Sequence, residues 1–172
     1  GLWVGVNCLD LHNVDVFRVI SNNVAGVWSD NAMVDERAKD QSEAAAVLNV
    51  IRSTGWRGLY FGGVAFKYQR PVDDLAAAAG LASQYMDVVT TSGPGTGKSA
   101  AVEKIRTMKE AVGDFPLAIA SGITPDNVAD YLPHSDCYLV ANGISKTFEE
   151  LDPFRVAKLI RRVRDYDRQL TD

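Results

Sequence analysis

The stretch Pro116-Leu-Ala-Ile-Ala-Ser-Gly-Ile-Thr-Pro-Asp-Asn127 contains the pattern that decides the fold. Its first five residues form an apolar run that indicates a buried strand, and the Ser-Gly pair then turns the chain. Thr124-Pro-Asp126 places a capping side chain before a proline, which is typical of the start of a helix. A strand followed directly by a helix is one βα unit, and the same order recurs along the chain.

Five further apolar runs share this character, because they are rich in β-branched and aromatic residues. We expect the six strands at residues 3–8, 24–28, 58–61, 87–90, 116–120 and 137–141. Their nearly continuous apolarity is typical of parallel strands that are covered on both faces. The distances between the runs fit βα units with right-handed crossovers, so the sequence predicts the α/β class.

Helices are predicted between these strands by apolar residues that recur on one face of a helix. The faces are Ala44, Val47, Leu48 and Ile51; Ala101, Ile105, Met108 and Val112; and Val156, Leu159, Ile160 and Val163. Residues 75–86 are rich in alanine and predict a fourth helix. Asp152-Pro153 repeats the capping pattern and predicts the start of the last helix.

The composition is that of a globular protein and limits the possible functions. With 172 residues, of which 47% are hydrophobic and 23% charged, we expect a single α/β domain over residues 1–172. Because the net charge is −4, the chain lacks the excess of positive charge that a nucleic-acid partner requires. No apolar run approaches the length of a membrane span, so we expect no transmembrane segment and a cytoplasmic location.

Cysteine and histidine are too few and too scattered to predict a metal site. Cys8 and Cys137 each lie alone in an apolar run, and we expect two buried free thiols. His12 and His134 lie away from the strand ends at which a site would form. The sequence therefore predicts no metal and no other cofactor.

The number of units leaves two architectures open. Six βα units fit either an open, doubly wound sheet or a TIM-type (β/α) barrel in which two of the eight units are missing. If two units are missing, the strand that begins at residue 3 is an open parallel edge. Such an edge aggregates unless it is paired, so we then expect a homo-oligomer.

A glycine-rich loop at residues 92–99 follows one predicted strand and invites comparison with a P-loop. Gly97, Lys98 and Ser99 fit the P-loop pattern, but Ser92 stands where the first glycine is required. Neither of the last two predicted strands ends in the aspartate that would hold magnesium, because one runs into Ser121-Gly122 and the other into Asn142-Gly143, so an NTPase is the less favoured hypothesis. We expect Gly95 and Gly97 to bind phosphate through their amides; the alternative is a flexible turn.

Two further loops follow the last two predicted strands, and each places a glycine just after the apolar run. Gly122 lies in the first loop, and Asn142 and Gly143 lie in the second. Neighbouring strand ends with exposed amides form the phosphate site of many barrels, often with a short extra helix, which we expect at residues 145–150. The alternative is that these glycines only turn the chain.

Three segments of the chain resemble the C-terminal half of the BtpA family. They are residues 87–97, 118–132 and 138–146. The resemblance extends from residues 5–7, which are similar to the family's third strand, to the final helix at residues 152–156. It implies a TIM-barrel fold related to phosphate-binding barrel enzymes, with strands three to eight present. The first two units are then absent, and the chain is either a fragment or a barrel completed by something else.

The sequence departs from the family's pattern after the third predicted strand. The family typically carries an aspartate and a Lys-His pair there. Lys67 matches the lysine, whereas Gly63 replaces the acid and Tyr68 replaces the histidine. This departure weakens any catalytic role that depends on the family's aspartate.

Polar residues at the carboxyl ends of the predicted strands are the candidates for chemistry, because active sites of α/β proteins lie there. We expect Lys67 to act as an amine nucleophile, a general base or an anion-binding cation, and Asp30 to be the catalytic acid. A solvated lysine and a turn aspartate are the alternatives. The expected substrate-binding residues are Asn7, Asn31, Thr91 and Ser121.

Two functions follow from these expectations. The first is an enzyme of the isomerase, aldolase or transferase type that acts on a small phosphorylated compound. The second is a non-catalytic assembly factor on a barrel scaffold, which the resemblance implies because the namesake of the BtpA family is a photosystem I biogenesis protein. An enzyme requires convergent polar side chains, whereas an assembly factor requires a large exposed apolar patch.

Overall fold

The computed structural model describes residues 2–171, and its centre is a sheet of parallel strands that follow one another in chain order. The strands are β1 (Gly5–Asn7), β2 (Gly26–Ser29), β3 (Leu59–Gly63), β4 (Val88–Ser92), β5 (Leu117–Ala120) and β6 (Cys137–Leu139). Each lies within or next to a predicted apolar run. In this sheet β1 and β6 are the edges, and each pairs with a single neighbour.

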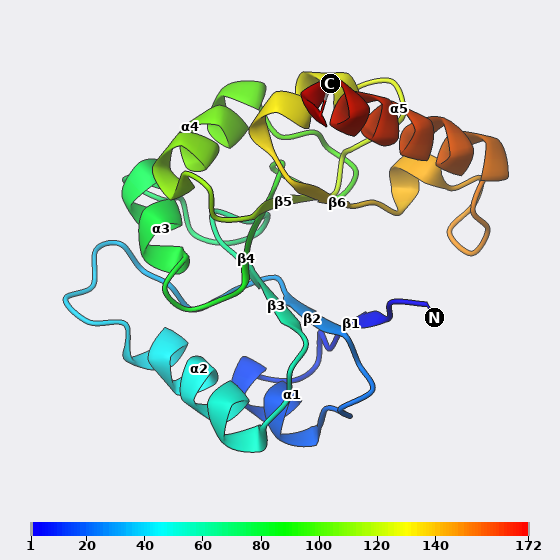
Figure 1. Cartoon of the computed structure of the whole chain (residues 1–172). Coiled ribbons are helices and arrows are strands. Elements are labelled where there is room, and N and C mark those ends of the chain that lie inside the picture. Colours follow the sequence, from blue (N-terminus) through cyan, green and yellow to red (C-terminus); the bar gives the residue numbers. More distant parts are fainter. Residues whose placement is uncertain (1, 172) are drawn as a thin grey trace.

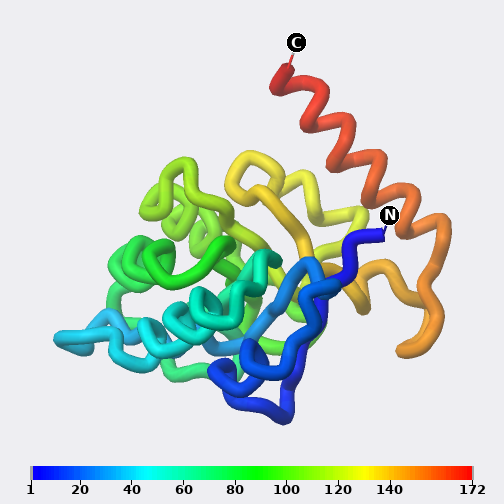
Figure 2. The backbone as a smooth tube through the Cα atoms, turned by 60° about the horizontal axis from the view of Figure 1, so that its bottom comes forward, coloured from blue at the N-terminus to red at the C-terminus, as the bar shows by residue number. Residues whose placement is uncertain are grey.

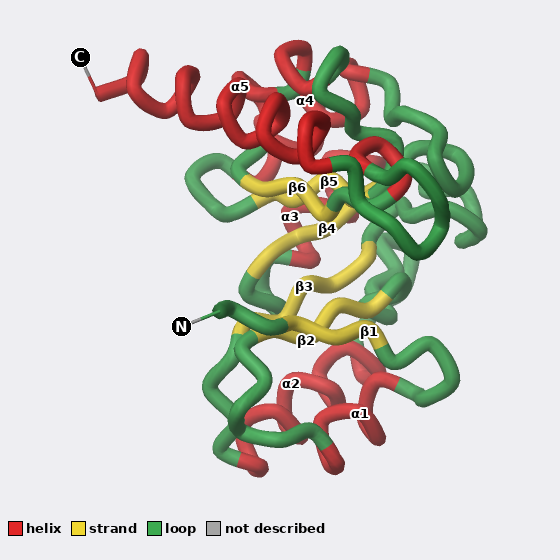
Figure 3. The backbone as a smooth tube through the Cα atoms, turned by 90° about the vertical axis from the view of Figure 1, so that its right-hand side faces the viewer, coloured by secondary structure: helices red, strands yellow, loops and turns green. Residues whose placement is uncertain are grey.

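Helices connect the strands and form an outer layer. They are α1 (Asn13–Val19), α2 (Ser42–Thr54), α3 (Leu75–Ala82), α4 (Val102–Val112) and α5 (Pro153–Thr171), with 3-10 turns at Val128–Asp130, Leu132–His134 and Asn142–Ile144. Figure 1 shows the helices along the outside of the curved sheet, with α1 and α2 next to the first strands and α3, α4 and α5 along the rest of the curve, and Figure 3 shows the curvature edge-on. The sheet is therefore curled into a half-barrel.

The main core lies between the helices and the outer face of the sheet. Strand residues of this face, including Val27, Val89 and Ile119, form one cluster with Phe17 of α1 and Ile105 of α4. All five helices contribute to the surrounding hydrophobic cluster, so they cover the same face. A doubly wound sheet would carry helices on both faces, and the barrel architecture is the one adopted.

The inner face of the sheet holds a second, smaller cluster of Phe61, Val88 and Ala118. At the base of this face Trp3 packs edge-on against Phe61, with ring centroids 6.0 Å apart. A β-carbon on Gly5 would lie 2.9 Å from the indole of Trp3, and the same ring covers Gly26. The two glycines of β1 and β2 therefore make room for this tryptophan.

Two predicted helices are wrong. The stretch after Thr124 forms only the 3-10 turns, because the Asn127 side chain folds back to accept from the Thr124 amide at 2.8 Å and Pro133 interrupts the segment. Residues 145–150 form a loop closed by an antiparallel bridge between Ser145 and Leu151. The short helix of this region precedes that loop, at Asn142–Ile144.

The last helix begins where the sequence predicts. The carboxylate of Asp152 accepts from the amides of Phe154 and Arg155 at 2.9 and 3.2 Å, and Pro153 is the first helical residue. Figure 2 shows α5 extending beyond the other elements toward the C-terminus. Within residues 2–171 no helix combines the length and apolarity that crossing a membrane would demand.

Candidate functional site

The loops after β4, β5 and β6 meet at the carboxyl ends of the strands. The amide of Gly97 donates to the Ser121 hydroxyl at 2.8 Å, which joins the first two loops. A β-carbon on Gly97 would lie 3.6 Å from Nδ2 of Asn142, so the third loop is in contact as well. The structure thus brings together residues that the sequence placed in three separate loops.

Glycine is required where these loops approach most closely. A β-carbon on Gly143 would overlap the carbonyl oxygen of Ile123, and one on Gly122 would overlap the carbonyl of Lys98. Gly122 also has a φ of +77°, which favours glycine. These glycines therefore have a packing role in addition to any role in binding.

Several amides in this region remain free to bind an anion. Those of Gly122, Asn142 and Gly143 donate to no acceptor within residues 2–171. Asn142 and Gly143 open a 3-10 turn, whose first amides have no partner inside the turn. Free amides at the end of a strand are the groups that bind phosphate in many α/β proteins.

The loop after β3 brings cationic and phenolic groups to the same region. The Lys67 ammonium lies 3.4 Å from Oγ1 of Thr96, and the Thr96 amide donates to the Tyr68 hydroxyl at 3.4 Å. These contacts with Thr96, with the nearby charges of Lys67 and Lys98, lower the pKa of the Tyr68 phenol. An anion at this position would meet two lysines and a phenol.

Backbone strain is concentrated at the strand ends of this half-barrel. Outside glycine, positive φ occurs in the described chain at Met33, Ala65, Tyr68 and Ser121, with values of 62°, 49°, 63° and 73°. All four follow the carboxyl end of a strand. Such conformations cost free energy and cluster at functional sites, so they support a site at this end of the barrel.

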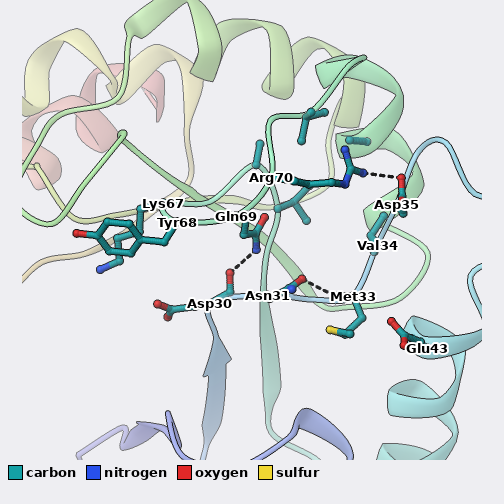
Figure 4. Close-up of a pocket in the computed structure, with 14 residues that line it drawn as sticks. Asp30, Asn31, Met33, Val34, Asp35, Glu43, Lys67, Tyr68, Gln69 and Arg70 are labelled. Atoms are coloured by element: carbon teal, nitrogen blue, oxygen red, sulfur yellow. Dashed lines mark hydrogen bonds and ion pairs between the residues drawn. The ribbon is translucent and has the colours of Figure 1, made fainter.

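Asp30 and Lys67 line one cavity of about 510 Å³, between the loop after β2 and the loop after β3. The Asp30 carboxylate accepts from the Asn7 amide group at 3.1 Å, and its backbone carbonyl accepts from Gln69 at 2.6 Å. Figure 4 shows how Asp30, Lys67 and Gln69 lie around this cavity. No hydrogen bond or ion pair links Asp30 to Lys67 within the described chain.

The wall of this cavity contains an ion-pair network that the sequence analysis missed. Arg70 binds both carboxylate oxygens of Glu36, at 2.5 and 3.1 Å, and its Nη2 lies 2.6 Å from Asp35. The side chain of Glu36 is only 4% exposed, and the Arg70 guanidinium lowers the pKa of this carboxyl to about 2. The network fixes the loop after β2 to the loop after β3.

Asn31 and Thr91 were also expected to bind the substrate, and the structure places them in different surroundings. Asn31 is exposed at the cavity, and its side-chain oxygen accepts from the Met33 amide at 2.9 Å. Thr91 is fully buried, and its hydroxyl donates to the Ala65 carbonyl at 3.2 Å. It shares the outer face of the sheet with Ile119, its neighbour in register. The structure therefore does not bring Thr91 to the cavity.

A second lysine, Lys104 of α4, was also missed. Its ammonium donates to the carbonyls of Ala65 and Ser92 at 2.5 and 2.6 Å. Burial lowers the pKa of this amine to about 8. Met108, which is fully buried, lies four residues after it, so the helical spacing places Lys104 next to the buried face.

Groups that could hold a metal are not assembled in the described chain. Within residues 2–171 no three histidine, cysteine, aspartate or glutamate side chains lie close enough to share an ion. Cys8 and Cys137 are free and half-buried. Burial raises the pKa of the Cys137 thiol to about 11, which suppresses its nucleophilic form.

Comparison with known proteins supports the fold. No family model matches the chain, and no curated protein matches it. Among solved structures, the crystal structure of phosphoribosyl anthranilate isomerase from Thermus thermophilus is similar, with a TM-score of 0.55 and 12% identity. The alignment covers 96% of this chain and 89% of that one. The predicted TIM-type fold is confirmed; at this identity the likeness concerns the fold alone, and membership of the BtpA family is not shown.

Proposed function

We propose that the chain binds a small phosphorylated compound at the carboxyl end of its half-barrel and catalyses an isomerase-type proton transfer on it. The observation that carries this proposal is the convergence of Gly97, Ser121 and Asn142 from three successive loops. A site built from three strand ends is typical of phosphate binding in barrels, where the loops after the last strands form the phosphate pocket.

The phosphate would be held by the amides of Gly122, Asn142 and Gly143, with that of Gly95 in the adjoining loop. The expected role of the Gly97 amide is not retained, because this amide already donates to the Ser121 hydroxyl and would only position the loop. Lys67 and Lys98 lie beside this region and influence the same phenol, Tyr68. The free amides would orient the bound phosphate through hydrogen bonds, and the two ammonium groups would attract its negative charge. Asn7, Asn31 and Ser121 would contact the remainder of the substrate.

The chemistry would be performed by Asp30 and Lys67, which line the same cavity. In a proton shift along a carbon chain, the carboxylate of Asp30 would take a proton from one carbon and return it to the next. The ammonium of Lys67 would stabilise the oxyanion that forms between these steps. The similar solved structure is that of an isomerase, and we propose this reaction type rather than an aldolase or a transferase by analogy of fold alone.

A second candidate, a non-catalytic assembly factor like the namesake of the BtpA family, is favoured by Gly63. This residue stands where that family carries an aspartate, and a β-carbon there would overlap the carbonyl group of Asp30. The backbone of Asp30 therefore occupies the space that the acid would need. If Asp30 does not replace that acid, the chain retains the scaffold without the chemistry.

The test is the thermal midpoint of the chain with inorganic phosphate, ribose 5-phosphate and, as a control, ribose. A ligand that binds only the folded state stabilises it by about 2.7 kcal/mol at 100 times its Kd. We expect a rise with the first two compounds and none with ribose. Lys67→Met should reduce the rise, whereas Asp30→Asn should keep it and abolish turnover. No rise with any phosphorylated compound would contradict the proposal and favour the assembly factor.

A further inference from the structure

A second cavity, of about 460 Å³, lies between the loop after β3 and the beginning of α4. Its walls include the apolar side chains of Phe66, Leu75 and Pro94, and Lys104 lines it from α4. Ser92, Gly93 and Pro94 of the glycine-rich loop form part of its wall, whereas Gly122, Asn142 and Gly143, which carry the free amides, do not line it. Lys104 therefore adds a second amine, beside that of Lys67, to a largely apolar space.

The surroundings of Lys104 differ from those of an ordinary lysine. Its contacts are the carbonyl oxygens of Ala65 and Ser92, and no carboxylate is paired with it within residues 2–171. Lys109, five residues later in the same helix, forms an ion pair with Asp136 at 2.8 Å. The two lysines lie on the same helix, but only Lys109 has a carboxylate that stabilises its ammonium form.

The other titratable groups around the cavity do not include a carboxylate that could pair with the Lys104 ammonium. They are Lys67, Tyr68 and Arg70, and no aspartate or glutamate lines it. Burial lowers the pKa of Lys104 to about 8, so roughly a tenth of this amine is neutral near pH 7, against less than about a thousandth of a free lysine. Lys67 favours a ligand with negative charge, whereas the charge of Arg70 is already paired with Glu36 and Asp35.

We propose that Lys104 is a nucleophilic amine that condenses with the carbonyl group of a small anionic aldehyde or keto acid bound in this cavity. The neutral amine attacks the carbonyl carbon, and a carbon–nitrogen bond forms. The carbonyl oxygen then leaves as water with the two protons of the amine, and the product is an imine on Nζ. No oxidant or reductant takes part in this step, and the site does not depend on the proposed isomerase activity.

The experiment is reductive trapping of the intact chain at pH 7 with glyoxylate, an anionic aldehyde, and cyanoborohydride, which reduces the imine to a stable amine. Peptide mapping by mass spectrometry then gives the rate of labelling at each lysine. We expect Lys104 to be labelled on the order of 100-fold faster than a lysine of ordinary pKa, and faster than Lys109. Equal labelling of Lys104 and Lys109 would overturn the proposal.

Two arginine variants act as a matched pair. Lys104→Arg retains a cation for the two carbonyls but removes the nucleophile, and Lys109→Arg retains the ion pair with Asp136. Fast labelling should disappear in the first variant and persist in the second, with circular dichroism confirming that both are folded. Fast labelling that survives Lys104→Arg would exclude this residue as the nucleophile.

A final comparison separates this site from the phosphate site. Lys104→Arg should leave the effect of inorganic phosphate on the thermal midpoint unchanged, whereas Lys67→Met should reduce that effect and leave Lys104 the fastest-labelled lysine. Glycolaldehyde, a neutral aldehyde, should label Lys104 at least about fivefold more slowly than glyoxylate, since the Lys67 ammonium attracts the anion. Equal rates for the two aldehydes would refute the anionic character assigned to the ligand.

Discussion

The amide of Gly97 donates to the hydroxyl of Ser121 across 2.8 Å, and the two residues belong to loops that follow adjacent strands. Ser121 holds a φ of +73°, a conformation that costs a non-glycine residue free energy. The serine is therefore retained in a strained position in which its side chain orders the neighbouring loop. This bond connects the two halves of the proposed phosphate site.

Removal of that hydroxyl tests the connection. Ser121→Ala should weaken phosphate binding about fivefold, because it removes one hydrogen bond, which contributes about 1 kcal/mol. The measurement is titration calorimetry with inorganic phosphate. Ser145→Ala is the control, since its hydroxyl donates only to Ala141 in its own loop, at 2.9 Å. If both variants bind phosphate as the wild type does, the Gly97 contact does not organise the site.

The ion pair between Glu36 and Arg70 predicts a pH dependence of stability. The pKa of Glu36 falls from 4.5 to about 2 on folding, so its contribution is complete above 4.5 and is lost as the pH falls toward 2. Glu36→Gln should reduce the free energy of unfolding by about 2 to 3 kcal/mol at pH 7 and by much less near pH 2. Urea unfolding at both pH values measures this difference.

An exposed ion pair provides the control for that experiment. Glu150 binds Lys146 at 2.9 Å on the surface, with both side chains largely in solvent. Glu150→Gln should change the free energy of unfolding by less than about 0.5 kcal/mol at pH 7. A loss for Glu36→Gln that is no larger than this, or that does not shrink in acid, would contradict the role given to Arg70.

Two glycine substitutions should act in opposite directions on stability. Gly80 lies inside α3, where a β-carbon would meet only the Ala111 carbonyl at an ordinary 3.7 Å, so Gly80→Ala should stabilise the chain by about 0.5 to 1 kcal/mol. Gly143→Ala should destabilise it by about 2 kcal/mol or more, because the new methyl overlaps the Ile123 carbonyl. Urea unfolding ranks the two variants, and the reverse order would refute the packing of the last two loops.

The tyrosines should ionise in a defined order. Tyr68 is 80% exposed and its pKa is lowered by its hydrogen bonds with Thr96, whereas burial raises the pKa of Tyr60 and Tyr138 to about 12. A spectrophotometric titration of phenolate should therefore lose its earliest step in Tyr68→Phe. Tyr138→Phe should lose a late step instead. An unchanged early step in Tyr68→Phe would show that the loop after β3 does not contact Thr96 in solution.

The edge strands lead to a prediction about assembly. β1 and β6 each have one neighbour, and an unpaired parallel edge is a surface to which another chain can bind. We therefore expect a homo-oligomer, detected by light scattering over a range of concentrations. A mass of 18.7 kDa at every concentration would count against it.

The strands and most helices were predictable from the sequence because their signals are local. Buried parallel strands are continuously apolar, and α2, α4 and α5 carry amphipathic spacing. α1 was missed because it is seven residues long and gives too few turns for a periodic pattern. The segment after Thr124 was misassigned because the side chain of Asn127 hydrogen-bonds back to the backbone of Thr124 and Gly122, and no α-helix forms there.

The candidate site was predictable where a single loop carries the signal. The glycines after β4, β5 and β6 were expected, and their loops do meet. The pairing of Arg70 with Glu36 joins residues 34 positions apart, and that of Lys104 with Ala65 joins residues 39 positions apart. Sequence patterns relate residues that are close along the chain, so they do not predict contacts between residues so far apart.

The order of the strands also bears on how the chain is made. Each strand hydrogen-bonds to the one synthesised before it, and no strand must insert between two that are already paired. The sheet can therefore extend in step with synthesis on the ribosome, one βα unit at a time. Because every new strand joins an existing edge, the entropy lost in closing each loop stays close to that of a single crossover, however long the nascent chain becomes.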